Sequence, residues 1–134
     1  MKNKRIFIIE DNALKYVYVE RVIKEMGITD IDWAKDSVSA INMIKKAKEA
    51  DCLYDLVISD MFFDWMGRIN PNAGQYVFNE FHKMGINIPT IFCSSDRVNV
   101  TGSVGSVHYV PSKDWESDLR ALVRKVFASD IISQ

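Results

Sequence analysis

Apolar runs and helical stripes alternate along this chain from its beginning to its end. Five short apolar runs predict β-strands, at residues 5–9, 31–34, 53–59, 88–93 and 107–110. Four other segments repeat their apolar positions with helical spacing, at residues 13–26, 38–47, 73–84 and 115–127. Strands that alternate with helices predict an α/β domain with a parallel sheet, right-handed crossovers and helices on both faces.

Polar residues at the segment ends support this division. Asp11 or Asn12 is placed to cap the first helix, and Gly27 is placed to end it. The second helix is preceded in the same way by Asp36 or Ser37, and the last helix by Ser112 or Asp114. Gly85 is placed to end the third helix. We expect one apolar face of the first helix to comprise Leu14, Val17, Tyr18, Val22 and Ile23.

Two segments depart from the regular pattern. Residues 61–72 predict a loop that is long for a strand-to-helix connection. Its aromatic part, residues 62–66, either covers a neighbouring site, contacts a partner or packs on the local core. Residues 96–106 should hold a helix, but they are rich in valine and glycine, which form helices poorly. We expect that fourth helix to be short, irregular or missing.

Composition narrows the class of protein. The 134 residues suffice for a single domain, residues 1–134, with 48% hydrophobic and 26% charged residues. A formal net charge of −1 gives no electrostatic reason to expect a nucleic-acid partner. No apolar run is long enough for a membrane span or a signal peptide, and two cysteines without metal-like spacing fit a reducing compartment. We therefore expect a cytoplasmic protein.

The candidate chemistry lies where the strands end. Asp60 closes the apolar run 53–59, and a carboxylate at the end of a buried strand is costly unless it is used. Glu10 and Asp11 follow the first strand. If these two strands are neighbours, three carboxylates meet at the edge of the sheet where ligands bind in such folds, and such a cluster favours a hard divalent cation. Helix capping is the alternative role for the pair after the first strand.

This ordered set of residues resembles the response regulator receiver domains of two-component signalling, over essentially the whole chain. The resemblance rests on Glu10-Asp11, on Val57-Ile58-Ser59-Asp60, on the strand that ends in Ser94-Ser95, and on Tyr109 in the last strand. It implies the flavodoxin-like, doubly wound fold, with five parallel strands in the order 2-1-3-4-5.

The resemblance also implies a role for each matching acid. Asp60 would be the phosphoacceptor, taking a phosphoryl group from a phosphohistidine on a sensor histidine kinase or a phosphotransfer protein. Asp11 would bind Mg²⁺ directly, and Glu10 would act through a water molecule. Asp60 and the backbone carbonyl of Phe62 would complete the protein ligands of the metal.

Three further positions belong to the implied switch. Ser94 would donate a hydrogen bond to a phosphoryl oxygen, and Tyr109 would change rotamer when the strand moves. The lysine of the family normally lies three residues after the aromatic residue, where this chain has Ser112; Lys113 lies one residue later. Lys113 reaches the site only if its loop bulges.

Three functions follow, in decreasing order of support. The first is a stand-alone response regulator that signals to an unknown downstream protein and has no enzyme activity beyond its own phosphorylation and dephosphorylation. The second is a pseudo-receiver, which binds proteins independently of phosphorylation. The third is a phosphatase that uses Asp60 as its nucleophile. By resemblance, phosphatases of the haloacid dehalogenase type need a second acid two residues later, where this chain has Phe62.

Overall fold

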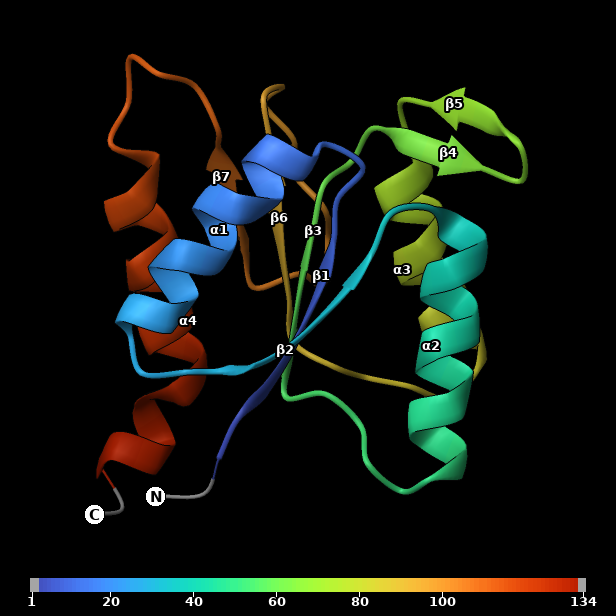
Figure 1. Cartoon of the computed structure of the whole chain (residues 1–134), viewed down its shortest axis with the longest axis horizontal. Helices are drawn as coiled ribbons and strands as arrows, with labels where there is room; N and C mark the ends of the chain where they lie inside the picture. Colours follow the sequence, from blue (N-terminus) through green and yellow to red (C-terminus); the bar gives the residue numbers. More distant parts are fainter. Residues whose placement is uncertain (1–2, 133–134) are drawn as a thin grey trace.

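The predicted α/β architecture is confirmed by the computed structural model, which describes residues 3–132, with side chains to residue 128. A five-stranded parallel sheet forms the centre (Figure 1), in the order β2 (Asp30–Ala34), β1 (Arg5–Ile9), β3 (Leu56–Ser59), β6 (Thr90–Ser94) and β7 (Gly105–His108). This is the predicted flavodoxin-like strand order. No helix in the described part of the chain is both long and apolar enough to cross a membrane.

Two layers of helices cover the sheet, one on each face. Figure 1 shows α1 (Ala13–Glu25) and α4 (Trp115–Ile132) on one side, and α2 (Ser37–Glu49) and α3 (Ala73–Lys83) on the other. Because both faces are covered, strands β1, β3 and β6 are buried along almost their whole length. Alternate side chains of β1 therefore enter different cores: Phe7 packs with α2 and α3, whereas Ile8 packs with α1 and α4.

Helices α1 and α2 begin where a side chain accepts a hydrogen bond from a free backbone N–H group, whereas α3 has no such side-chain cap. The Asn12 side chain accepts a hydrogen bond from the Lys15 N–H at 3.0 Å, and Asp36 accepts one from Ser39 at 2.7 Å. The predicted alternatives at both helix starts are thereby resolved.

The predicted apolar face of α1 is wrong in part. Leu14, Val17 and Tyr18 are exposed, with 61%, 44% and 37% of their surface accessible. The buried residues of the helix are Val22 and Ile23, as predicted, together with Val19 and Lys15. The helix is therefore rotated so that a lysine faces the interior, which the pattern of apolar residues does not indicate.

Residues 61–72 form a hairpin where the sequence predicted a loop. Strands β4 (Phe63–Trp65) and β5 (Arg68–Asn70) pair antiparallel through Met66 and Gly67, whose φ angles are +54° and +94°. Two positive φ angles are what a two-residue hairpin turn of matching twist requires. Phe63 is fully buried in the core, while Phe62 and Met66 are exposed, so the segment packs on the core through only part of its aromatic residues.

The fourth helix, which the sequence predicted to be short, irregular or missing, is missing from the described residues. No helix lies between β6 and β7 among the described residues, and the connecting segment instead buries Val100 against Phe78 and Phe92. The fifth strand of the sheet comes two residues earlier than predicted, so that Tyr109 lies just beyond its end. The Tyr109 backbone N–H donates to the Ser94 carbonyl at 2.7 Å, which keeps the tyrosine beside β6.

Candidate functional site

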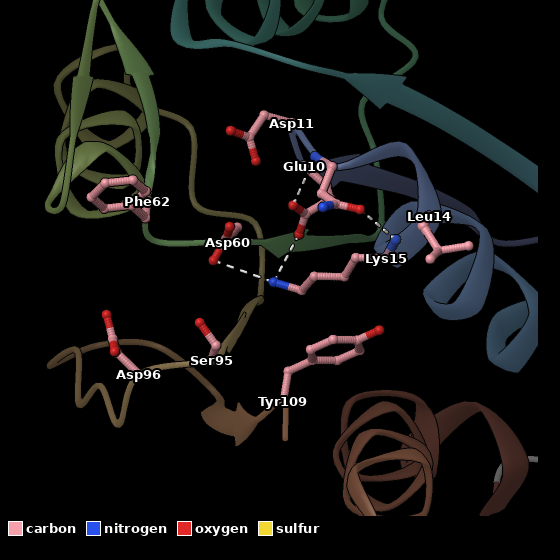
Figure 2. A pocket seen from close by; sticks show the side chains of 10 residues that line it. Glu10, Asp11, Leu14, Lys15, Asp60, Phe62, Ser95, Asp96 and Tyr109 are labelled. Carbon is pink, nitrogen blue, oxygen red and sulfur yellow. Dashed lines mark hydrogen bonds and ion pairs between the residues drawn. The ribbon is translucent and has the colours of Figure 1, made fainter. Parts of the chain in front are cut away.

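A pocket of about 600 Å³ opens at the carboxyl ends of β1, β3 and β6. In Figure 2 the labelled side chains converge on the pocket from the segments that follow β1, β3, β6 and β7 and from α1. The lining residues are Glu10, Asp11, Asn12, Leu14, Lys15, Asp60, Phe62, Ser95, Asp96 and Tyr109. The pocket therefore lies where ligands bind in open α/β sheets.

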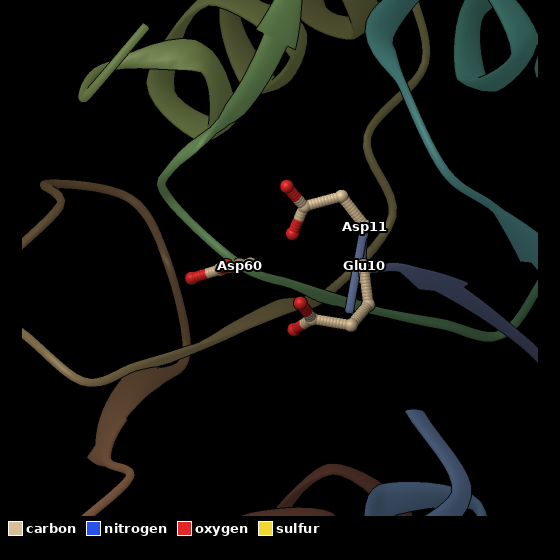
Figure 3. Close-up of side chains that lie close together, drawn as sticks. All are labelled: Glu10, Asp11 and Asp60. Carbon is tan, nitrogen blue, oxygen red and sulfur yellow. The ribbon is translucent and has the colours of Figure 1, made fainter. Parts of the chain in front are cut away.

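Glu10, Asp11 and Asp60 come together as the sequence predicted. One carboxylate oxygen from each residue lies within 4.8 Å of the others (Figure 3), and the three residues range from buried Glu10 to exposed Asp11. Backbone bonds fix the two strand ends: the Glu10 N–H donates to the Ala34 carbonyl and the Asp60 N–H to the Ile9 carbonyl, each at 2.9 Å. Neighbouring strands in parallel register thus place the acids at one edge.

The two oxygens of Asp60 have different surroundings. Oδ1 accepts the backbone N–H of Met61 at 2.7 Å and lies 3.3 Å from the ammonium nitrogen of Lys15. Oδ2 accepts no hydrogen bond from any residue between 3 and 132. The side chain as a whole is 11% exposed, so this oxygen belongs to a carboxylate held firmly at the wall of the pocket.

Lys15 is the functional residue that the sequence analysis missed. Its ammonium nitrogen lies 2.8 Å from Glu10 Oε1 and donates to the Cys93 carbonyl at 2.6 Å, while the residue is only 8% exposed. Figure 2 shows its side chain running from α1 into the space between Glu10 and Asp60. The buried positions of α1, residues 15, 19, 22 and 23, follow helical spacing, and this spacing was the signal that could have found Lys15.

Burial and charge act against each other in this cluster. Burial raises the pKa of Glu10 to about 7, against the lowering effect of the Lys15 ammonium and with a further raising effect from Asp60. Burial by itself lowers the pKa of Lys15, but the Glu10 and Asp60 charges outweigh it and the pKa is raised. The lysine therefore stays charged at neutral pH and offsets part of the negative charge of the acids.

The two serines at the end of β6 differ in their relation to the pocket. Ser94 is buried, and its hydroxyl accepts the Asp96 N–H at 3.2 Å. Ser95 is the serine that lines the pocket. Ser94 thus braces the turn after β6, one residue away from the pocket wall.

Tyr109 and Lys113 also differ in their relation to the pocket. Tyr109 lines it, with its ring centroid 5.1 Å from the Lys15 ammonium and 4.7 Å from the ring of Trp115. Lys113 is exposed, and its side chain is not among the described residues that line the pocket. Its backbone N–H closes a tight turn onto the Val110 carbonyl at 3.1 Å, so the loop does not bring this lysine inward.

The donor atoms of the acid triad fit a hard divalent cation. Carboxylate oxygens are the ligands that Mg²⁺ prefers, and the exposed Asp11 leaves one side of the cluster open to solvent. Phe62, whose backbone carbonyl was predicted as a further ligand, has its side chain in the pocket lining. The acid triad is therefore suited to Mg²⁺, although a lysine ammonium already lies among its oxygens.

No model of a protein family matches the sequence, and neither does any curated protein. Solved structures do match. The signal receiver domain of an HD domain-containing protein from Pseudomonas fluorescens Pf-5 aligns with a TM-score of 0.71 at 14% identity, covering 96% of this chain and 97% of that chain. Response regulator TrrA from Thermotoga maritima, solved in complex with Mg²⁺-BeF, has a TM-score of 0.67 at 22% identity and covers 92% and 98%.

A longer protein contains the same fold as one part. The response regulator PhyR from Brucella abortus aligns with a TM-score of 0.70 at 21% identity, covering 99% of this chain and 51% of that chain. The chain therefore has the receiver-domain fold, as its resemblance to receiver domains implied.

Proposed function

We propose that this protein is a phosphoacceptor module of a two-component phosphorelay, with Asp60 as the accepting residue and Mg²⁺ as its cofactor. The observation that carries the proposal is the Asp60 carboxylate, held at the end of β3 beside Glu10 and Asp11 in a pocket at the carboxyl edge of a receiver fold. A carboxylate nucleophile needs little further chemistry for phosphoryl transfer, which depends mainly on positioning and charge neutralisation.

The proposed reaction uses the free oxygen of Asp60. Oδ2 attacks the phosphorus of a phosphohistidine on the donor protein, the phosphorus–nitrogen bond breaks, and the histidine nitrogen leaves with the bond's electron pair and takes up a proton. The product is an aspartyl phosphate. Bound Mg²⁺ would offset the negative charge between the carboxylates and the phosphoryl oxygens. Its protein ligands would be Asp11, Asp60 and the Phe62 carbonyl, with Glu10 acting through water.

The fold offers a route from this site to the surface. Ser95 and Tyr109 line the same pocket, and Tyr109 packs on Trp115 at the start of α4. In our proposal the new charge on Asp60 shifts Ser94 at the end of β6, Ser95 after it and the Tyr109 ring, and a downstream protein recognises the altered surface. Ser94 is proposed to follow the movement through its bond to Asp96.

The test is phosphorylation of Asp60. The wild-type protein is incubated with acetyl phosphate, with and without Mg²⁺, and its intact mass is measured. We expect a mass gain of one phosphoryl group that requires Mg²⁺ and disappears in Asp60→Asn. Asp96→Asn is the matched control, because Asp96 lines the pocket outside the triad, and this variant should still be modified. No gain in the wild type, beside a receiver domain that is modified, would refute the proposal.

A pseudo-receiver is the second candidate, and one observation favours it. The Lys15 ammonium already occupies the acid cluster and partly neutralises it without any metal. A protein of this kind would bind its partner in one fixed conformation. The result expected for a pseudo-receiver is normal partner binding by the Asp60→Ala variant together with no mass gain in the wild type.

A further inference from the structure

The ammonium group of Lys15 lies among three oxygen atoms at the centre of the carboxyl edge of the sheet. It contacts three oxygen acceptors: Glu10 Oε1 at 2.8 Å, the Cys93 carbonyl at 2.6 Å and Asp60 Oδ1 at 3.3 Å. An ammonium has three protons, which matches the number of these oxygen atoms. A lysine that is only 8% exposed and contacts three oxygen atoms is part of the site and does not merely lie at its rim.

The three acceptors belong to three different strands. Glu10 follows β1, Asp60 follows β3, and Cys93 lies in β6. Tyr109 comes just after β7, and the centroid of its ring lies 5.1 Å from the ammonium nitrogen. A single side chain from α1 therefore contacts residues at the carboxyl ends of β1, β3, β6 and β7, four of the five strands of the sheet.

We propose that Lys15 is the resident counter-cation of this site, and that a divalent cation must compete with its ammonium for Glu10 and Asp60. The inference rests on the proposed function, because it takes the acid triad to be the Mg²⁺ site. It assigns to α1 the positive charge that the sequence led us to expect from Lys113.

Charge counting supports the competition. When all three carboxylates are ionised, they and the one ammonium leave a net charge of −2 in the cluster before a metal arrives. A metal held directly by Asp60 and through water by Glu10 attracts the negative charge of both carboxylates, which are the two that the ammonium contacts. Mg²⁺ binding should therefore weaken the Lys15 contacts with Glu10 and Asp60, whereas the contact with the Cys93 carbonyl can stay in place.

The consequence is a low affinity for Mg²⁺ in the wild type. Like charges a few ångströms apart repel strongly in a partly buried site. Removing the ammonium while keeping the side-chain volume should therefore tighten Mg²⁺ binding by at least about tenfold. Removing an exposed lysine charge from the neighbouring loop should change the affinity by less than about twofold.

The experiment compares Lys15→Met with Lys113→Met as the matched control. Mg²⁺ affinity is measured by titration calorimetry, and thermal unfolding is followed in EDTA and in saturating MgCl₂. We expect Lys15→Met to bind Mg²⁺ more tightly than the wild type and to gain more thermal stability from it. Lys113→Met should follow the wild type in both measurements. Equal Mg²⁺ affinity in Lys15→Met and wild type would overturn the inference, as would an increase confined to Lys113→Met.

A second measurement needs no variant, in case Lys15→Met does not fold. In wild-type protein labelled with ¹⁵N on lysine, one side-chain ammonium should exchange its protons slowly with water in EDTA, because only Lys15 among the described lysines is buried. Added Mg²⁺ should speed this exchange. An ammonium signal that Mg²⁺ leaves unchanged, while calorimetry shows the ion bound, would refute the competition.

The outcomes separate the two proposals. If Mg²⁺ binds and Lys15 is indifferent to it, the counter-cation inference fails while the phosphoacceptor proposal stands. If neither wild type nor Lys15→Met binds Mg²⁺, the metal site of the proposed function fails and the inference falls with it. If Mg²⁺ binds in competition with Lys15 but Asp60 is never phosphorylated, the inference holds for a protein that only binds the cation.

Discussion

Gly74 allows the start of α3 to lie directly against the backbone of Asp60. Its N–H donates to the Met61 carbonyl at 3.0 Å. A Cβ atom at this position would lie 2.3 Å from the Asp60 carbonyl oxygen and 2.9 Å from the Met61 Cα. Both are backbone atoms, so no side chain can rotate away to make room. We therefore predict that Gly74→Ala damages both the stability of the fold and the geometry of the site.

Two effects of opposite sign decide the magnitude. Replacing glycine with alanine inside a helix ordinarily stabilises a protein by at most about 1 kcal/mol. Overpacking at a close contact ordinarily costs about 1–3 kcal/mol. The missing separation here is about 0.7 Å, since real Cβ atoms essentially never approach closer than 3.0 Å. Because backbone must move, the cost lies at the upper end, and we expect a net loss of about 1–2 kcal/mol.

The site should suffer along with the fold. The atoms that must move belong to Asp60 itself, and a misplacement approaching 1 Å can cost about a hundredfold in a positioned reaction. We expect Gly74→Ala to lower the rate of Asp60 phosphorylation by acetyl phosphate at least about tenfold. The free energy of unfolding is measured by urea denaturation, and the rate by intact mass over time.

Gly105→Ala is the matched control. Its added Cβ would meet Leu122 Cδ2 at 3.1 Å, which is the end of a flexible side chain. We expect a smaller change in the free energy of unfolding and an unchanged phosphorylation rate. A Gly74→Ala protein that is as stable as the wild type, with normal phosphorylation, would contradict the reasoning about the close contact.

Three other predictions concern the core and the buried charges. The Cys93 thiol is buried, and burial raises its pKa, so in the native protein a thiol reagent at pH 8 should modify exposed Cys52 alone and should reach both cysteines only after unfolding. The raised pKa of Glu10 means that the folded state binds a proton here more tightly than the unfolded state does. The resulting stabilisation is therefore fully present below pH 4.5 and is lost as the pH rises through about 7. Urea unfolding at several pH values should therefore show Glu10→Gln gaining stability relative to the wild type across this range, and a constant difference would contradict the assignment. Phe63→Ala should cost about 3–5 kcal/mol in the same assay because its ring is fully buried, and a loss below about 1 kcal/mol would mean that the hairpin is not anchored in the core.

Most of the fold could be predicted from local patterns in the sequence. The apolar runs that end in Ile9, Ser59 and Ser94 lie at the centre of the sheet, and the helix starts at Asn12 and Asp36 are set by side chains within three residues. These features depend on neighbours in the sequence, so a single chain displays them. The meeting of Glu10, Asp11 and Asp60 followed from one further rule, that the carboxyl ends of parallel strands share an edge.

Other features depend on contacts that no local pattern displays. The hairpin of β4 and β5 is held by Phe63, which is buried among helices far from it in the sequence. The segment between β6 and β7 forms no helix, and its Val100 fills a space beside Phe78 and Phe92. The poor helix formers in this segment predicted that it would be irregular, but only its packing determined the path of its backbone.

The sequence by itself determined a receiver-like α/β sheet with three acids at one edge, because strand burial and helix capping are local properties. Only the tertiary structure decided which cation accompanies those acids. Lys113, one residue beyond the position of the family's lysine, was the candidate from the resemblance, but it is exposed, whereas Lys15 is buried. The physical reason is that burying an ammonium is favourable only where enough acceptors converge on it. The acceptors of Lys15 come from Glu10 after β1, Asp60 after β3 and Cys93 in β6.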